Sequence, residues 1–461
     1  MTRDIETTIA AKRKIRDHTE GSIIGSILRM SLPSMIGFAS GNIYDIADMF
    51  WVARLGAKHV AAVTIFTAFY WVIGAANMIA GTGSVAVISR RYGEKDYAKT
   101  AAVIKETFIL KWALAIFFGA LAYPFLHEIL LILGAEPEVA ALGVSYGRIQ
   151  FLGLGFCFSA YTIYTALRSV ADPNKAMFIM VGGALLNMVL DPFLIFGWWI
   201  FPEMGLVGAA VASVVSYAVI FIVGLYIFFG GKTNIRLRLK GEVGMRLRSI
   251  LEIFTIGIPS GINSISWSLS RVAIMPIIAI FGTSVVAIYG VGMRVSALGI
   301  MIIVGLGLGV SSLIGHNLGA GKFERAKETA RQSILLSMGI MAFFSIVNLI
   351  FAPQIVWLFF KTPEMLSLGT AILRIIAVCF PFVGLFIAME EIYTGAGENK
   401  PAMVFSLIHS WILEIPMALA LTRLFMVDQN GVWWALTVAS ILSALLFYLW
   451  FRRGGWLQKK V

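Results

Sequence analysis

Long apolar runs separated by short polar segments dominate the chain. The run from residue 61 to residue 81, for example, carries no charge. A helix needs about 20 such residues to cross the hydrocarbon core of a bilayer, whereas the strands of membrane barrels alternate apolar and polar residues. The pattern therefore predicts twelve membrane-spanning helices. We place them at residues 25–53, 59–88, 101–125, 139–167, 176–198, 205–230, 250–281, 286–314, 329–352, 367–395, 402–423 and 432–451.

The composition supports an all-α integral membrane protein. Of the 461 residues 59% are hydrophobic and only 13% are charged, against about 25% charged in soluble domains. This excludes a disordered chain, a disulfide scaffold and an ordinary soluble enzyme. Cys157 and Cys379 both lie in apolar runs without metal-ligand spacing, so we expect inert thiols. Residues 1–22 are polar, and we predict no removable signal peptide.

The net charge of +12 could indicate a nucleic-acid partner, but the distribution of Lys and Arg favours membrane orientation. Of the 37 such residues, 28 lie in connections on one side of the predicted spans, four on the other side and five within spans. Positive residues concentrate in cytoplasmic loops. We therefore expect a multi-pass protein of the plasma (cytoplasmic) membrane, with both termini in the cytoplasm and no nucleic acid bound.

The two halves of the chain repeat at one constant offset, which predicts a parallel repeat of six spans. The matching pairs are Pro33-Ser34 with Pro259-Ser260, Leu55-Gly56 with Phe281-Gly282, Gly93 with Gly319, Tyr97 with Phe323, Pro137-Glu138 with Pro363-Glu364, Arg148 with Arg374, and Gly205 with Gly431. We expect two pseudo-symmetric six-helix lobes around a central cleft, which is where transporters of this kind bind substrate.

This repeat defines the expected division of the chain. The parts are a cytoplasmic N-terminal arm (1–22), an N-lobe (23–230), a basic cytoplasmic linker (231–249), a C-lobe (250–452) and a cytoplasmic tail (453–461). The linker is expected to be solvated, with contact to lipid headgroups as the alternative.

Acidic residues inside the N-lobe spans suggest chemistry, because ionisable groups at membrane depth are costly. Tyr44 and Asp48 are spaced i,i+4 and share one helix face, and Asp45 lies close by. Asn187 and Asp191 share a face in the fifth span. Two buried carboxylates could exchange a proton, or Asp48, Asn187 and Asp191 could hold Na⁺. The alternatives are a hydrogen-bonded structural cluster or a wet outer vestibule.

The first span also contains a candidate hinge. Pro33 lies fifteen residues before Asp48. A proline removes one helix hydrogen bond and permits a kink, so we expect the first span to bend there.

The C-half lacks these acids, since Ile274 and Met417 stand at the repeat positions of Asp48 and Asp191. Its own charged residues are expected to form internal ion pairs, with substrate contact as the alternative. They are Arg271, Arg294, Arg374, Glu390, Glu391 and Glu414. Glu414 is the best placed to contact a cation, and His409 is expected to be a hydrogen-bonded packing residue.

Aromatic residues are expected to line the cleft together with Glu414, namely Tyr70, Phe151, Tyr161 and Tyr164. The segment "GAGK" at 319–322 lacks the full spacing of a phosphate-binding loop, and no catalytic motif is present. We therefore expect no enzyme activity and no cofactor, with energy supplied by an ion gradient.

At this point the chain resembles the multidrug and toxic compound extrusion (MATE) family over residues 23–452. The features are "P…Y-x-x-x-D" in the first span and "N-x-x-x-D-P" in the fifth. Further similar segments are "LRSVADPNKAM" (167–177), "GLVGAAVAS" (205–213) and "GAGENKPAM" (395–403). The N-lobe pattern is similar to the DinF-like bacterial and archaeal branch. Departures are the additional Asp45, Ala171 in place of a turn glycine, and no acid in 264–272.

The resemblance implies antiport, in which H⁺ or Na⁺ enters as a small amphipathic cation leaves. It nominates Tyr44, Asp48, Asn187 and Asp191 as the coupling site, with bending at Pro33. Ser213 stands where the family often has threonine and could be a ligand. Membrane lipids are the other expected partner, and the chain is expected to work as a monomer. The runner-up is a flippase for a lipid-linked oligosaccharide or peptidoglycan precursor. A membrane-embedded enzyme is a more remote alternative.

Overall fold

A computed structural model describes residues 19–238, 247–425 and 428–457 of the protein. Most of the N-terminal arm (1–18), part of the linker (239–246) and the end of the tail (458–461) lie outside the described residues. Within the described ranges the chain forms helices and no strand. Nine of these helices are long and apolar enough to cross a membrane, or up to twelve if each of three bent pairs is one span. The predicted all-α membrane fold is confirmed.

The helices of the N-terminal half correspond to the predicted spans, with two of them broken. They are α2 (Ile23–Ala53), α3 (Ala57–Gly93), α4 (Tyr97–Ala122), α5 (Leu126–Ile132), α6 (Pro137–Leu152), α7 (Leu154–Ser169), α8 (Pro173–Ile195) and α9 (Leu206–Phe229).

The C-terminal half repeats this order, except that its third span is one continuous helix and its fifth span contains π-helical stretches. Its helices are α10 (Leu247–Ala279), α11 (Thr283–Gly319), α12 (Phe323–Phe359), α13 (Pro363–Ala377), α14 (Phe380–Ala396), α15 (Lys400–Leu407), η1 (Ile408–Glu414), α16 (Ile415–Leu419), η2 (Ala420–Leu424), α17 (Gln429–Phe451) and a 3₁₀ turn η3 (Gly455–Leu457).

The starts of the helices show the repeat at the level of single residues. Gly56 and Gly282 are equivalent in the two halves, and they precede α3 and α11 with φ of 118° and 97°. This backbone conformation is open to glycine and strained for other residues. Pro137 and Pro363, also equivalent, occupy the first turns of α6 and α13, where a missing N–H has no cost. The same local chemistry therefore sets the same turn in each half.

Three predicted spans are bent pairs of helices rather than single helices. The pair α4 and α5 turns by 70°, the pair α6 and α7 by 54°, and the pair α13 and α14 by 47°. Between α6 and α7, the Gly153 N–H closes the first helix on the carbonyl oxygens of Ile149 and Phe151. The predicted span 402–423 is also irregular, because it contains two stretches of π-helix, η1 and η2.

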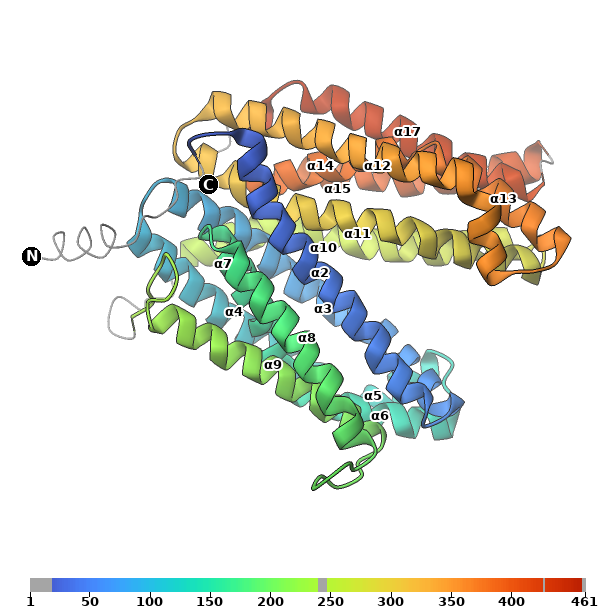
Figure 1. The fold of residues 1–461 in the computed structure, drawn as a ribbon, viewed down its shortest axis with the longest axis horizontal. Coiled ribbons are helices and arrows are strands. Elements are labelled where there is room, and N and C mark those ends of the chain that lie inside the picture. The colour runs from blue at the N-terminus through green and yellow to red at the C-terminus, as the bar shows by residue number, and fades with distance from the viewer. Residues whose placement is uncertain (1–18, 239–246, 426–427, 458–461) are drawn as a thin grey trace, which may run out of the picture.

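The two halves pack together at one end of the molecule and diverge toward the other (Figure 1). Helix α2 crosses obliquely between them and packs along α8 of its own half and α11 of the other. Helix α10 packs along α3 in the equivalent way. We call the end where α2 and α10 begin and α3 and α11 end the inner end. There, Lys322 donates to the carbonyl oxygen of Thr19 at 3.0 Å.

Candidate functional site

The N-lobe acids predicted from the sequence gather between α2, α8 and α9. Asp48 of α2 and Asp191 of α8 are 8% and 0% exposed, so both carboxyl groups are buried. Their side chains repel each other electrostatically. The i,i+4 spacing of Tyr44 with Asp48 turns both toward α8 and α9, as the helical period requires.

Hydrogen bonds link this cluster across the three helices. The hydroxyl groups of Tyr44 and Ser213 lie 3.0 Å apart. The Asn187 amide fits with its NH₂ group toward Asp191, donating to Oδ2 at 2.9 Å, while its oxygen accepts from the Ser213 N–H at 3.1 Å. This orientation follows from the hydrogen-bond network. Tyr44, Asn187, Asp191 and Ser213 are therefore brought together as expected.

Each of the two buried carboxyl groups keeps one oxygen without a hydrogen-bond partner. Among the described residues, no donor reaches Oδ1 of Asp48 or Oδ1 of Asp191. Buried polar atoms are otherwise paired in nearly all proteins, and an unpaired carboxyl oxygen is costly. The two oxygens are chemically suited to a proton or to a hard cation such as Na⁺.

Asp45 differs from these two residues in its surroundings. It is on α2 but is exposed in the structure, and it interacts electrostatically with Asp48. No hydrogen bond joins it to the Tyr44–Ser213–Asn187–Asp191 network among the described residues. Asp45 is therefore placed to act on the charge of Asp48 from outside the cluster.

The four aromatic residues expected to line a cleft all lie on helices of the N-lobe. Tyr70 and Phe151 both pack on Phe66, with ring centroids 5.6 and 5.7 Å away, and Phe151 is buried in that aromatic core. Tyr161 lies under the ammonium group of Lys111. Tyr164 packs against the apolar core shared by α3, α4, α7 and α9. That these aromatics together line a ligand site stays a prediction.

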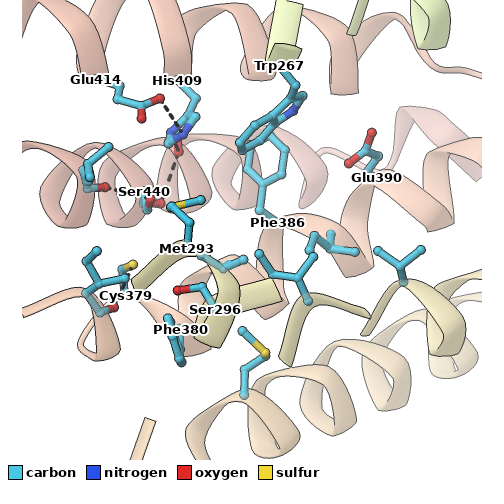
Figure 2. Close-up of a pocket in the computed structure, with 18 of the residues that line it drawn as sticks. Trp267, Met293, Ser296, Cys379, Phe380, Phe386, Glu390, His409, Glu414 and Ser440 are labelled. Atoms are coloured by element: carbon cyan, nitrogen blue, oxygen red, sulfur yellow. Dashed lines mark hydrogen bonds and ion pairs between the residues drawn. The ribbon is translucent and has the colours of Figure 1, made fainter. Parts of the chain in front are cut away.

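Glu414 lies in the other lobe, in a cavity of about 420 Å³ lined by C-lobe residues alone (Figure 2). Among the described residues no arginine forms a direct ion pair with Glu390, Glu391 or Glu414, so the expected contacts are wrong in that form. Arg271 attracts Glu414 only at longer range. Glu414 instead pairs with His409, at 3.4 Å between Oε2 and Nε2. Arg271 donates to the Tyr289 hydroxyl at 3.3 Å, because the guanidinium turns toward α11. His409 also lies 3.1 Å from the Ser443 hydroxyl, in keeping with its expected hydrogen-bonded role.

A further buried charge was not selected from the sequence. Lys111 of α4 is 0% exposed, and its Nζ has no hydrogen-bond partner among the described residues. It lies 4.5 Å from the centroid of the Tyr161 ring, a cation–π distance. The only sequence signal was a lysine within an apolar run.

Comparison with known proteins matches this architecture. A family model described as MatE matches the chain twice, at residues 33–193 and 259–420. The chain is 28% identical over 460 residues to the "Probable multidrug resistance protein YpnP" of Bacillus subtilis (strain 168), covering 97% of this chain and 99% of that protein. It is 28% identical to the "Multidrug export protein MepA" of Staphylococcus haemolyticus (strain JCSC1435), covering 93% of each.

Solved structures agree at the level of the fold. A crystal structure of MATE in the bent conformation superimposes with a TM-score of 0.89 at 25% identity, covering 96% of this chain and 97% of that one. Two six-helix lobes of parallel repeats, with buried polar residues inside each lobe, are typical of a multi-pass membrane transporter. The two family matches begin at the equivalent positions 33 and 259, which confirms the repeat. The chain belongs to the MATE family, the family that the MatE model describes.

Proposed function

We propose that this protein is a multidrug efflux antiporter that exports amphipathic, mostly cationic compounds in exchange for H⁺ or Na⁺. The observation that carries the proposal is the pair of unpartnered buried oxygens, Asp48 Oδ1 and Asp191 Oδ1. The printed names of the relatives, which concern multidrug export or resistance, support the substrate class. The membrane is the plasma membrane, with the inner end toward the cytoplasm.

In the proposed cycle, a proton or Na⁺ reaches Asp48 and Asp191 from outside. The bound ion offsets the repulsion between the carboxyl groups and lets the Tyr44–Ser213 and Asn187–Asp191 hydrogen bonds rearrange. Coupling requires only that drug and ion favour opposite states of this site. Asp45, next to Asp48, would influence which of the two acids binds the ion first.

The movement that follows is a bend of α2 near Pro33. Proline has no N–H, so the carbonyl oxygen of Arg29 lacks its helical partner and α2 is weakened at that turn. Bending changes the space between α2 and α8, which reduces room for the drug. The inner-end contacts between the two lobes then separate, and the ion is released to the cytoplasm.

The proposal is tested with purified protein in liposomes. Export of a fluorescent cation is followed under an inward H⁺ gradient at fixed Na⁺, and then under an inward Na⁺ gradient at fixed pH. Asp48→Asn and Asp191→Asn are expected to abolish gradient-driven export, because an amide cannot take up a proton and brings no negative charge to balance a bound Na⁺. Glu203→Gln, in an exposed outer loop, is the matched control and should export normally.

The outcome names the ion or rejects the proposal. Export driven by only one gradient identifies the coupling ion. Full ion-driven export by Asp48→Asn contradicts the proposed coupling site. The flippase alternative is not favoured, because the N-lobe site is acidic and a pyrophosphate group requires cationic partners.

A further inference from the structure

The C-lobe contains its own polar cavity, at a place that corresponds to the N-lobe site. Arg271 is the repeat equivalent of Asp45, so α10 presents a charged residue where α2 does. Facing it, η1 supplies His409 and Glu414, in the span that is equivalent to α8. Every residue around the cavity belongs to the C-lobe. A ligand held there would therefore need no group from the Asp48–Asp191 cluster.

The π-helical form of η1 explains why two polar side chains meet at this cavity. His409 and Glu414 are five residues apart, which in an α-helix places side chains about 140° apart. The wider i→i+5 turn of a π-helix brings them onto neighbouring faces, and π-helical turns are frequent at functional sites. Figure 2 shows both side chains directed toward each other at the cavity wall.

The charge of the cavity favours a cation. Glu390, Glu391 and Glu414 line it against a single Arg271. Arg271 donates to Tyr289 and Met293 on α11 and attracts Glu414 from a distance without a direct contact, while Glu390 accepts from Asn263. Glu414 is 2% exposed, and its contact with His409 at 3.4 Å is longer than an ordinary N–H···O hydrogen bond. It is thus a buried carboxyl group with a weakly held partner.

The remaining wall is aromatic and apolar. Trp267 and Phe386 both lie against the His409 ring, with centroids 5.3 and 6.3 Å away, and Figure 2 shows them side by side at the cavity. Indole faces attract organic cations. The volume of about 420 Å³ falls within the range of roughly 300–1,000 Å³ that holds small organic ligands.

We propose that this cavity is a second binding site, for an amphipathic organic cation, separate from the N-lobe coupling site. Glu414 receives the charged group in place of His409, and the aromatic part of the ligand packs on Trp267 and Phe386. The site binds its ligand whether or not Asp48 and Asp191 are able to take up an ion.

The test measures binding of radiolabelled tetraphenylphosphonium, a permanent aromatic cation, to the full-length protein in lipid nanodiscs by equilibrium dialysis. Glu414→Gln is expected to weaken one class of site by about tenfold or more, since an interaction with a charged group is lost. Ser296→Phe, which fills the cavity without changing its charge, should have the same effect. Glu364→Gln, at the exposed start of α13, is the matched control and should bind as the wild type does.

A double Asp48→Asn, Asp191→Asn variant separates the two proposals. It is expected to lose gradient-driven export and to keep the Glu414-dependent binding. Absence of export from the wild-type protein, with this binding intact, would remove the antiporter proposal and leave the second site standing. Unchanged tetraphenylphosphonium binding in a folded Ser296→Phe variant would overturn the second site. The same holds if Glu414→Gln binds normally.

Discussion

Ala171 adopts a left-handed backbone conformation, and the equivalent residue of the C-terminal half is a glycine. Its φ is 59°, and Gly397, the equivalent residue of the C-terminal half, has a φ of 78°. Both residues close the same turn, with N–H groups bonded to the carbonyl oxygens of Arg168 and Thr394. A left-handed conformation costs a non-glycine residue about 1–2 kcal/mol. Ala171→Gly is therefore expected to stabilise the protein by about 1 kcal/mol, seen as a higher midpoint of thermal unfolding in detergent. Gly397→Ala should lower the midpoint. A shift of the same sign and size in both variants would show that the backbone of Ala171 is not strained.

At the same scale, the sequence predicted the N-lobe cluster well because helical spacing decides which side chains share a face. Tyr44 with Asp48, and Asn187 with Asp191, needed only the i,i+4 rule. The C-lobe cavity was not predicted, since an internal space depends on how side chains from several helices fill their common volume. Glu414 was selected by its depth in the span and His409 as a hydrogen-bonded packing residue, but their contact with each other was not predicted.

Pro33 affects the stiffness of the whole helix α2. It lies within the continuous helix α2, where proline costs about 3 kcal/mol relative to alanine. Pro33→Ala restores the N–H that the Arg29 carbonyl lacks, so α2 should become stiffer and the protein more stable. We expect ion-driven export to fall about tenfold or more while tetraphenylphosphonium binding is retained. That fall would correspond to a rise of about 1.4 kcal/mol in the barrier to the conformational change.

The control for this prediction is Pro353→Ala, in α12 far from the N-lobe cluster. It also restores a helical N–H, although the Leu349 carbonyl that would accept it already accepts from Arg374 Nε at 3.2 Å, and it should leave export unchanged. Normal export by a folded Pro33→Ala variant would show that α2 does not need to bend at this turn.

At the scale of elements, hydropathy predicts the spans but not the breaks within them. Residues 139–167 are predicted as one span, yet the chain turns by 54° after Leu152, and Gly153 closes α6 by its own backbone bond. An apolar run specifies that a segment lies in the membrane, not that it is straight. The π-helical stretches Ile408–Glu414 and Ala420–Leu424 flank Pro416, and hydropathy alone does not predict them.

At the scale of the whole molecule, one scaffold is used twice and given different chemistry. The family matches at 33–193 and 259–420 confirm the repeat that the constant offset predicted. The polar residues do not follow it, since acids stand on α2 and α8 in one lobe and Arg271, His409 and Glu414 stand in the other. The two halves therefore share their turns and close helix contacts, whereas the polar residues inside the two lobes differ.

The clearest of these close contacts seals the inner end. A Cβ atom on Gly93 would overlap the backbone carbonyl of His316, and one on Gly319 would overlap the carbonyl of Arg90. Since the repeat pairs Gly93 with Gly319 and Arg90 with His316, one pseudo-twofold axis relates both contacts. Gly319→Ala is therefore expected to force α3 and α11 apart and favour a state open at this end.

The readout is maleimide labelling of Ser89→Cys, in a background with Cys157→Ala and Cys379→Ala. Ser89 is buried and lies against Gly315, so labelling should rise several-fold over the parent. Gly339→Ala, in α12 with open space around it, should leave labelling unchanged, and equal labelling in both variants would show that this contact does not limit opening.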